Sequence, residues 1–494
     1  MPYSSIMTLS IYNTLTRRQE PFTTVDPGKV KMYYCGVTVY DYCHLGHARA
    51  CIVWDVVRRY LEFIGYDVRY IQNFTDVDDK ILNRARLENS TMEAVSERFI
   101  KAYFEDMARL GIKEADEYPR ATHTMNGIKR LIHDLEQKGF AYPSDGDVYY
   151  AVRKFDGYGK LSGRKLDDMQ AGASERVNVE DPEYQKKKDP FDFALWKAAK
   201  PSEPAWDSPW GKGRPGWHIE CSAMVRDRLG DTIDIHAGGA DLIFPHHENE
   251  IAQSEAVTGK PLANYWLHNG MVKVDGEKMS KSLGNFITIR ELLDRGVDPM
   301  AVRLFVMMAQ YRKPIDFTDE AILAATNGWH TIKEGLLFGY QHRKKLGWDE
   351  SNLIQNPKSK IQNSQIERFK EAVNDDFNFP GGLVIIFELA KELNRERNII
   401  VHQGKTETPA NELLQKWQTL TTLADVLGLT TKPEIETPKP DSISDVEIEE
   451  LIQRRQEARK AKNFAESDRI RDELLIKSIT LIDSKEGTRW QRKN

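Results

Sequence analysis

The sequence predicts an α/β protein in which a parallel sheet is interrupted by an insertion and followed by an α-helical bundle and a small C-terminal domain. Three observations lead to this. Strand-like and helix-like segments alternate in the first third of the chain, a charged and weakly periodic stretch follows, and the pattern is helical after residue 290. The chain has 494 residues, too many for one hydrophobic core, so about three domains or more are expected.

The alternation in the first third is the basis for the parallel sheet. Residues 31–35 (KMYYC) and 66–73 (YDVRYIQN) have the composition of buried strands, and an amphipathic helix is predicted between them over 47–64. A second helix is predicted over 91–110. A strand, a helix and a second strand in that order form a βαβ unit, whose right-handed crossover makes the two strands parallel. We therefore expect a Rossmann-type domain.

The pattern changes after residue 140. Residues 145–150 resemble part of a hairpin and 157–189 are charged, which favours an insertion before strand-like segments return at 232–236 and 265–274. A proline-bearing stretch at 430–440 is typical of a linker. The predicted parts are a Rossmann-type catalytic domain in two halves (1–140 and 210–275), an inserted domain (141–209), a connecting region (276–319), a helical bundle (320–428), a linker (429–443) and a C-terminal domain (444–494).

Composition narrows the class of protein. Hydrophobic residues make up 40% of the chain and charged residues 29%, with a mean hydropathy of −0.57, as in a well-solvated globular protein. No apolar run approaches the roughly 20 residues that span a membrane, and the N-terminal residues lack the pattern of a secretory signal. The four cysteines are too few for a disulfide framework. We expect a cytoplasmic protein without a membrane partner.

Four side chains suited to a metal ion stand in separate regions of the chain. In the segment PHHENE, His246 and Glu250 are four residues apart and share one face of a helix. Cys221 and Cys35 add two thiols, and this donor set suits a tetrahedral zinc ion. The cysteines are far apart in sequence, however, and PHHENE also reads as a set of solvated helix-cap charges. His247 is an alternative ligand.

Two short motifs indicate a nucleotide site. Residues 43–49 (CHLGHAR) fall where a strand should turn into a helix, and Gly46 there lets the backbone approach a ligand closely. Residues 278–282 (KMSKS) place two lysines on a polar loop, where they would neutralise charge on a triphosphate. Each motif alone is also explained by chance or by an exposed basic loop, but the pair favours nucleotide chemistry. A P-loop pattern is absent.

Longer segments along nearly the whole chain support one specific resemblance. They include YYCGVTVYDYCHLGHAR, NFTDVDDKI, RPGWHIECSAM, IDIHAGGADLIFPHHENEIAQSEA and KMSKSLGNF. Together they resemble class I aminoacyl-tRNA synthetases, and among these the cysteinyl-tRNA synthetase family. The family's His-Ile-Gly-His signature stands here as His44-Leu45-Gly46-His47, where leucine keeps the apolar volume of isoleucine.

The resemblance implies an enzyme that activates L-cysteine with ATP and Mg²⁺, passes it to tRNA(Cys), and acts as a monomer. It implies one zinc ion per chain, held by Cys35, Cys221, His246 and Glu250. The cysteine pocket would be formed by Cys35, Gly36, Thr75, Trp217, His236 and Asp241. The ATP site would be formed by His44, Gly46, His47 and Lys281, and the catalytic groups would be His44, His47, Lys278 and Lys281.

Zinc offers a physical basis for choosing cysteine over serine. The two amino acids differ by one atom, and an ordinary pocket cannot strongly reject such a close isostere. A zinc ion favours the thiolate of cysteine, whereas the serine hydroxyl stays a poor, protonated ligand. No editing domain is then required, and the predicted insertion is short for one.

The C-terminal region has features expected of an RNA-binding surface. The net charge is −5, so contact with nucleic acid must rely on local basic surface. Residues 453–462 (QRRQEARKAK) carry five basic side chains on a predicted helix, although most such runs are simply solvated. Trp490 is suited to stacking on an exposed base. By resemblance, Arg459, Asp468 and Asp483 would read the anticodon.

Two other functions fit part of the sequence. One is an ATP-dependent cysteine ligase that passes cysteine to a small amine, and the basic segment after residue 444 argues against it. The other is a tRNA-binding relative without catalytic activity, which the intact histidine, metal-ligand and KMSKS motifs argue against.

Overall fold

The computed structural model describes residues 8–168, 185–201, 203–279, 283–349, 363–431, 445–477, 479–484 and 487–492. Lys281 and most of the predicted linker lie outside these residues. The described chain forms two compact units. The first contains the described parts of Met1–His330, Ile361–Ile386 and Leu423–Leu429, and the second contains those of Thr331–Lys360, Phe387–Thr422 and Thr430–Asn494.

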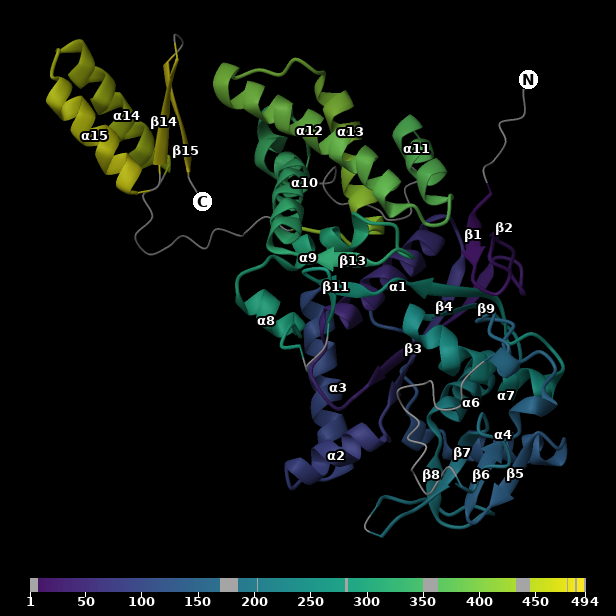
Figure 1. Ribbon diagram of the computed structural model, residues 1–494. Coiled ribbons are helices and arrows are strands. Elements are labelled where there is room, and N and C mark those ends of the chain that lie inside the picture. The colour runs from purple at the N-terminus through teal and green to yellow at the C-terminus, as the bar shows by residue number, and fades with distance from the viewer. Residues whose placement is uncertain are drawn as a thin grey trace, which may run out of the picture. The chain divides into compact units, whose positions relative to one another are not determined.

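The centre of the first unit is a four-stranded parallel sheet, which confirms the predicted fold class. Its strand order is β10-β9-β3-β4, and helix α1 (Leu45–Phe63) connects the central strand β3 to the edge strand β4 (Figure 1). The predicted strands at 31–35 and 66–73 lie inside β3 and β4, and the predicted helix at 47–64 is α1. The strands are β3 (Lys29–Thr38), β4 (Asp67–Thr75), β9 (Ile233–Gly239) and β10 (Ala263–Asn269).

Burial explains why this sheet is parallel and continuous. In β3, residues 32–35 (MYYC) are buried on both faces of the strand, as expected where helices cover both sides of a parallel sheet. The crossover helix α1 is also buried over most of its length. Because the strands are parallel, their carboxyl ends lie at one edge, where ligands bind in open α/β sheets.

A second sheet of the first unit is antiparallel and has the order β5-β6-β7-β8. Its strands are β5 (Ala141–Ser144), β6 (Asp147–Tyr150), β7 (Phe193–Ala198) and β8 (Gly213–Pro215). In Figure 1 it lies in the blue-to-teal part of the chain with α4 (Met125–Gln137), α6 (Trp217–Leu229) and α7 (Glu248–Thr258). The last strand of this sheet, β8, lies directly before α6 and after residue 209, where the predicted insertion ends.

The strand-like segment 265–274 is two strands, not one. β10 ends at Asn269, and β11 (Val272–Val274) joins another sheet with the order β12-β11-β13. The two strands are separated at Gly270. A Cβ atom at this position would overlap the backbone of Lys313, so only glycine fits where the chain turns. The other strands here are β12 (Glu277–Lys278) and β13 (Ile315–Phe317), and a hairpin of β1 (Ser10–Asn13) and β2 (Arg18–Pro21) precedes β3.

Helices dominate after residue 290, as predicted. In the second unit, Trp417 is buried and donates from its indole N–H to the carbonyl of Leu336 at 2.8 Å, while Gly339 leaves room for its ring. The remaining helices of the chain before the C-terminal region are α2 (Asp79–Leu87), α3 (Met92–Arg109), α8 (Ile289–Asp294), α9 (Pro299–Met307), α10 (Asp319–Leu346), α11 (Ser364–Val373), α12 (Phe379–Gln403) and α13 (Ala410–Val426).

The C-terminal region is a two-helix, two-stranded module with its own core. It consists of α14 (Asp445–Lys460), α15 (Phe464–Ile476), β14 (Ile479–Ser484) and β15 (Gly487–Arg492), and the two strands form an antiparallel pair. Leu481 and Trp490 pack against its core. That core is formed by Ile448, Ile452, Ile470, Leu474 and Ile479.

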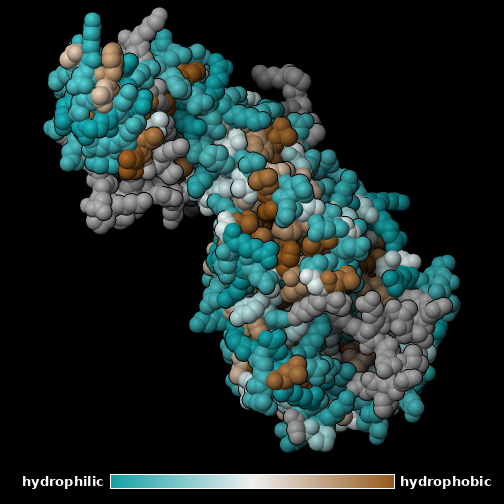
Figure 2. Space-filling view, turned by 60° about the vertical axis from the view of Figure 1, so that its left-hand side comes forward, coloured by the Kyte–Doolittle hydropathy of each residue, from teal (hydrophilic) through white to brown (hydrophobic). Residues whose placement is uncertain are grey.

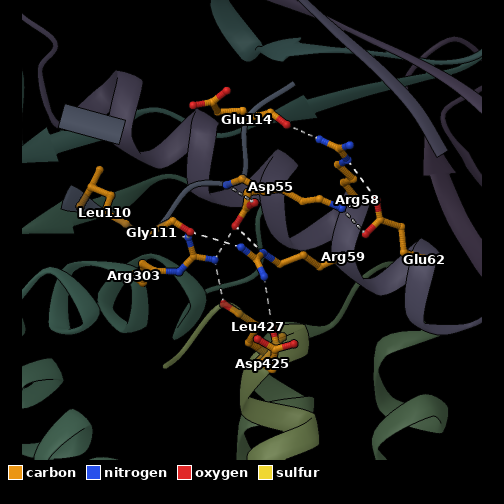
Figure 3. Close-up of polar contacts among 11 residues, drawn as sticks. Asp55, Arg58, Arg59, Glu62, Leu110, Gly111, Glu114, Arg303, Asp425 and Leu427 are labelled. Carbon is orange, nitrogen blue, oxygen red and sulfur yellow. Dashed lines mark hydrogen bonds and ion pairs between the residues drawn. The ribbon is translucent and has the colours of Figure 1, made fainter. Parts of the chain in front are cut away.

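A buried arginine fixes the signature-bearing helix α1 within the first unit. Arg303, on α9, is fully buried, and its guanidinium donates to the Asp55 carboxylate at 2.6 Å. The same group donates to the carbonyl oxygens of Leu427 at 2.9 Å and Leu110 at 3.3 Å (Figure 3). α1, α9, the segment after α3 and the end of α13 therefore meet at a single side chain.

One face of the molecule shows how hydrophilic and hydrophobic residues are distributed. Most of the face drawn in Figure 2 is hydrophilic, and patches of hydrophobic residues lie among the hydrophilic ones. Within the described residues, no helix combines the length and the apolar composition that a membrane crossing requires.

Candidate active site

Four buried side chains converge at the carboxyl edge of the parallel sheet. Cys35 comes from β3, Cys221 from α6, His246 from the short helical segment Ile243–His247, and Glu250 from the first turn of α7. One donor atom from each lies within 4.8 Å of the others. The Cys35 thiol lies 3.6 Å from His246 Nε2 and 3.3 Å from Glu250 Oε1, and these last two atoms are 3.1 Å apart. The predicted metal ligands thus form one cluster.

The side chains of this cluster shift one another's pKa values in both directions. Hydrogen bonding from Cys35 lowers the pKa of the Cys221 thiol to about 6, although burial opposes it. Burial raises the pKa of Cys35. Burial also opposes ionisation of Glu250, yet the adjacent imidazoles hold its pKa well below the usual value. Two sulfurs, an imidazole and a carboxylate at these separations match the donor types and number of a tetrahedral zinc site.

The alternative ligand His247 belongs to an overlapping cluster. Cys35, His236, His247 and Glu250 also have donor atoms within 4.8 Å of one another. His236 Nε2 lies 2.9 Å from Glu250 Oε2, whereas His247 Nε2 lies 3.9 Å from Glu250 Oε1. The other ring nitrogen of His247 lies 2.8 Å from His268. His236 therefore contacts one oxygen of the Glu250 carboxylate, and His246 and His247 approach the other.

Most of the predicted cysteine pocket surrounds the cluster. The ring of Trp217 stacks on His246 with centroids 4.2 Å apart, and His236 contacts Glu250 as described. Gly36 lies at an irregularity of β3, where a Cβ atom would overlap the carbonyl of Asn73. Asp241 is exposed, so it is the one predicted pocket residue whose side chain lies outside the buried group.

The last predicted pocket residue, Thr75, leads to a group that the sequence did not single out. Thr75 ends β4, is buried, and donates from its hydroxyl to Glu220 Oε2 at 3.2 Å. Glu220 lies in the first turn of α6, beside Cys221. Its place in WHIECS, one residue from a predicted ligand, was the only available signal.

The histidine signature forms the N-terminal cap of α1. The ring of His44 accepts a hydrogen bond from the backbone N–H of Gly46 at 3.0 Å, and His47 Nδ1 accepts from the His44 N–H at 3.3 Å. The two rings stack with centroids 3.7 Å apart. Burial lowers the pKa of His47 well below its usual value, so this imidazole is neutral. The paired rings stand at the positive end of the helix dipole.

The KMSKS segment approaches this signature. Leu45 N–H donates to Ile287 O at 3.1 Å, and Ile289 N–H donates to Cys43 O at 2.9 Å. The side chain of Met279 lies over Gly46, 3.7 Å from where a Cβ atom would stand. Lys278 ends β12 and is exposed, whereas Lys281 lies outside the described residues. The histidine signature is thus joined by backbone hydrogen bonds to the segment that follows KMSKS in the chain.

The predicted anticodon residues lie in the C-terminal module. Arg459 pairs with Asp483 at 3.1 Å. The sequence did not single out Arg455, which grips both oxygens of Asp483 at 2.9 and 2.8 Å. Asp468 is exposed and pairs with Arg471 at 3.3 Å. Trp490 packs against the module's core and donates to Glu449 at 2.7 Å.

Comparisons with known proteins agree with this arrangement. The family described as tRNA synthetases class I (C) catalytic domain matches residues 21–327, and the DALR domain matches residues 368–431. A cysteine–tRNA ligase of Gloeothece citriformis is 68% identical over 98% of this chain and 100% of its own length. The corresponding Synechocystis sp. protein is 64% identical with the same coverage of both chains.

Solved structures show the same fold at low identity. A methionyl-tRNA synthetase of Mycobacterium tuberculosis in complex with methionyl-adenylate has a TM-score of 0.56 at 16% identity, covering 81% of this chain and 90% of that one. A leucyl-tRNA synthetase in a ternary complex from Agrobacterium radiobacter also has a TM-score of 0.56, at 12% identity, covering 82% of this chain and 85% of that one. The chain belongs to the cysteinyl-tRNA synthetase family of class I aminoacyl-tRNA synthetases.

Proposed function

We infer that the chain is an aminoacyl-tRNA ligase that activates L-cysteine with ATP and transfers it to tRNA(Cys). The observation that carries this function is the buried set of two thiols, an imidazole and a carboxylate, together with a histidine signature hydrogen-bonded to the segment that follows KMSKS. Relatives over the whole length of the chain are cysteine–tRNA ligases. The comparisons give no support to a ligase acting on a small amine.

We propose that Cys35, Cys221, His246 and Glu250 hold zinc. The fit of the donor set supports this, since all four side chains are buried and within 4.8 Å of one another. Bound there, zinc would supply a Lewis acid that binds the thiolate of cysteine and discriminates against the serine hydroxyl. Thr75, Trp217 and His236 would form the walls that position the amino acid, and Gly36 would let its backbone approach.

In the first reaction, the cysteine carboxylate attacks the α-phosphate of ATP, giving cysteinyl-adenylate and diphosphate. His44 and His47 would donate hydrogen bonds to the α-phosphate at the N-terminus of α1, and Lys278 and Lys281 would balance its growing negative charge. A hydroxyl of the terminal adenosine of tRNA then attacks the acyl carbon, and AMP leaves. No protein nucleophile is needed, so positioning and charge stabilisation supply most of the catalysis.

We propose that the C-terminal module binds the anticodon. The paired Arg459 and Asp483 offer donors and acceptors to base edges, and Asp468 lies exposed on the adjacent helix. Trp490 is partly buried, so stacking on a base would use only the rim of its ring. A cytoplasmic location and a monomeric state complete the proposal, and light scattering of the purified protein would test the second.

The decisive test is charging of total tRNA with radiolabelled cysteine or serine in the presence of ATP and Mg²⁺. Cysteinyl-tRNA without seryl-tRNA is expected. A His44→Ala variant should lose diphosphate exchange, whereas the matched His133→Ala variant, which alters an exposed histidine of α4, should retain it. Serine charging at a comparable rate, or equal activity of the two variants, would contradict the proposal.

A further inference from the structure

Glu220 is a buried acid beside the proposed cysteine pocket. Its side chain is 0% exposed, at the first turn of α6 between Trp217 and Cys221. Its Oε2 accepts a hydrogen bond from the Thr75 hydroxyl at 3.2 Å. Among the described residues, Oε1 has no hydrogen-bond partner and no cation pairs with the carboxyl group. Burying a carboxyl group with an unsatisfied oxygen costs free energy. The single hydrogen bond that Glu220 makes, to Thr75, therefore points to a role in orienting that hydroxyl.

The direction of this hydrogen bond determines what Thr75 can offer a ligand. A threonine hydroxyl has one proton and two lone pairs. When that proton is given to Glu220 Oε2, Thr75 Oγ1 can act only as an acceptor toward any other group. The acceptor role of Oε2 does not require a charge on Glu220, because a carboxylic acid protonated on Oε1 still accepts at Oε2.

The ligand expected at such an acceptor is a cationic donor. In cysteine, the α-ammonium is the only group of that kind. The carboxylates of Asp76 and Asp78, like the Cys221 thiol, are close enough to act electrostatically on Glu220. A hydroxyl that can only accept suits an ammonium and cannot donate to the carboxylate of the substrate.

We propose that Glu220 is a positioning residue, which takes the hydroxyl proton of Thr75 and so makes Thr75 an obligate acceptor for the α-ammonium of cysteine. This inference rests on the proposed function, in which Thr75 lines the cysteine pocket. It extends that function by naming the group of the substrate that Thr75 recognises and the residue that prepares Thr75 for it.

Two substitutions separate the acceptor from the charge. Glu220→Gln keeps an oxygen acceptor for Thr75 and cannot ionise, whereas Glu220→Asp keeps an ionisable carboxyl group and withdraws the acceptor by one methylene. The KM for cysteine in ATP–diphosphate exchange should stay within about twofold in Glu220→Gln and rise about tenfold in Glu220→Asp, the size expected for one hydrogen bond to a charged group. The kcat should change less than KM in both.

The probe for the ammonium is 3-mercaptopropanoate, which has the thiol and carboxylate of cysteine and lacks the amino group. Its inhibition constant should be nearly the same in all Glu220 variants. An equal loss for cysteine and 3-mercaptopropanoate would show a general packing role and overturn the inference. So would a raised KM in Glu220→Gln together with a normal KM in Glu220→Asp, because charge would then matter and the acceptor would not.

The failure of this inference can be told apart from failure of the proposed pocket. Thr75→Val should raise the KM for cysteine, and Thr75→Ser should not. If Thr75→Val leaves KM unchanged, the place of Thr75 in the pocket is wrong. If Thr75→Val raises KM and Glu220→Asp does not, the pocket stands and the positioning role of Glu220 is refuted. Bound zinc and far-ultraviolet circular dichroism would verify that each variant is folded.

Discussion

Replacing Arg303 by methionine should destabilise the first unit more than any surface change nearby. The guanidinium is fully buried and is held by the Asp55 carboxylate and by main-chain carbonyls from two other segments (Figure 3). Methionine keeps the apolar stem and removes every one of these donors. Asp55, which is 3% exposed, keeps its hydrogen bonds from Arg59 at 2.9 Å and from the Lys113 N–H at 3.0 Å. Its negative charge therefore loses only one of its partners.

The expected loss follows from these contacts. Breaking a buried ion pair by removing one partner costs about 3–5 kcal/mol, and the remaining partners of Asp55 favour the lower part of this range. At about 2.1 cal/mol/K of unfolding entropy per residue, a loss of about 3 kcal/mol in a unit of this size lowers Tm by about 4 °C. The matched control is Arg59→Met, which removes a partly exposed partner of the same carboxylate and should cost about 1 kcal/mol.

The assay is a thermal melt of the whole protein, read at its first transition, because a chain of several domains does not unfold in one step. Hydrogen exchange gives a local readout. Amides of residues 110–116 and 423–429 should exchange faster in Arg303→Met and be little changed in Arg59→Met. If Arg303→Met lowered Tm by no more than Arg59→Met, or left exchange in both segments unchanged, the assigned role of the buried guanidinium would be refuted.

Two further predictions concern the metal cluster and the C-terminal module. Cys221→Ser should reduce bound zinc well below one ion per chain, as measured by elemental analysis after gel filtration. The control Cys51→Ser should retain the metal, because the Cys51 thiol lies on α1 outside the cluster. Equal zinc in the two variants would refute the ligand assignment. Arg455→Lys cannot keep the two-point grip on Asp483, so the KM for tRNA should rise several-fold while ATP–diphosphate exchange is unchanged. Arg454→Lys, at an exposed site, is its control, and a loss of exchange in Arg455→Lys would contradict a role limited to tRNA.

The sequence predicted the elements whose pattern is local. The strand at 31–35, the helix at 47–64 and the strand at 66–73 each have a periodicity of their own, and the structure confirms all of them. The division of the strand-like segment 265–274 into two strands was not predicted. It depends on the close approach of Lys313 to Gly270, and Lys313 lies in a loop more than forty positions later in the chain. Periodicity carries no information about such tertiary contacts.

The candidate site was predictable in part for the same reason. His246 and Glu250 are near in sequence and suggested a shared helix face, but their convergence with Cys35 and Cys221 depends on the whole sheet, so only family resemblance indicated it. Glu220 differs from an exposed glutamate in nothing that a sequence displays, and its burial and its single hydrogen bond appear only in three dimensions.

Three of the buried acids of the first unit, Asp55, Glu250 and Glu220, divide into two kinds. Asp55 pairs with Arg59 and Arg303, and Glu250 contacts the rings of His236 and His246, so each of these acids has side-chain partners within the fold. Glu220 has Thr75 alone among the described residues. Because an uncompensated buried acid opposes folding, its neighbours identify what it serves: a hydroxyl at the carboxyl end of β4, where an open α/β sheet binds its ligand. The free energy spent on burying Glu220 is therefore not recovered by a partner within the fold, and Glu220 lies at the carboxyl end of the sheet. The burial of Asp55 and of Glu250 is offset by their side-chain partners.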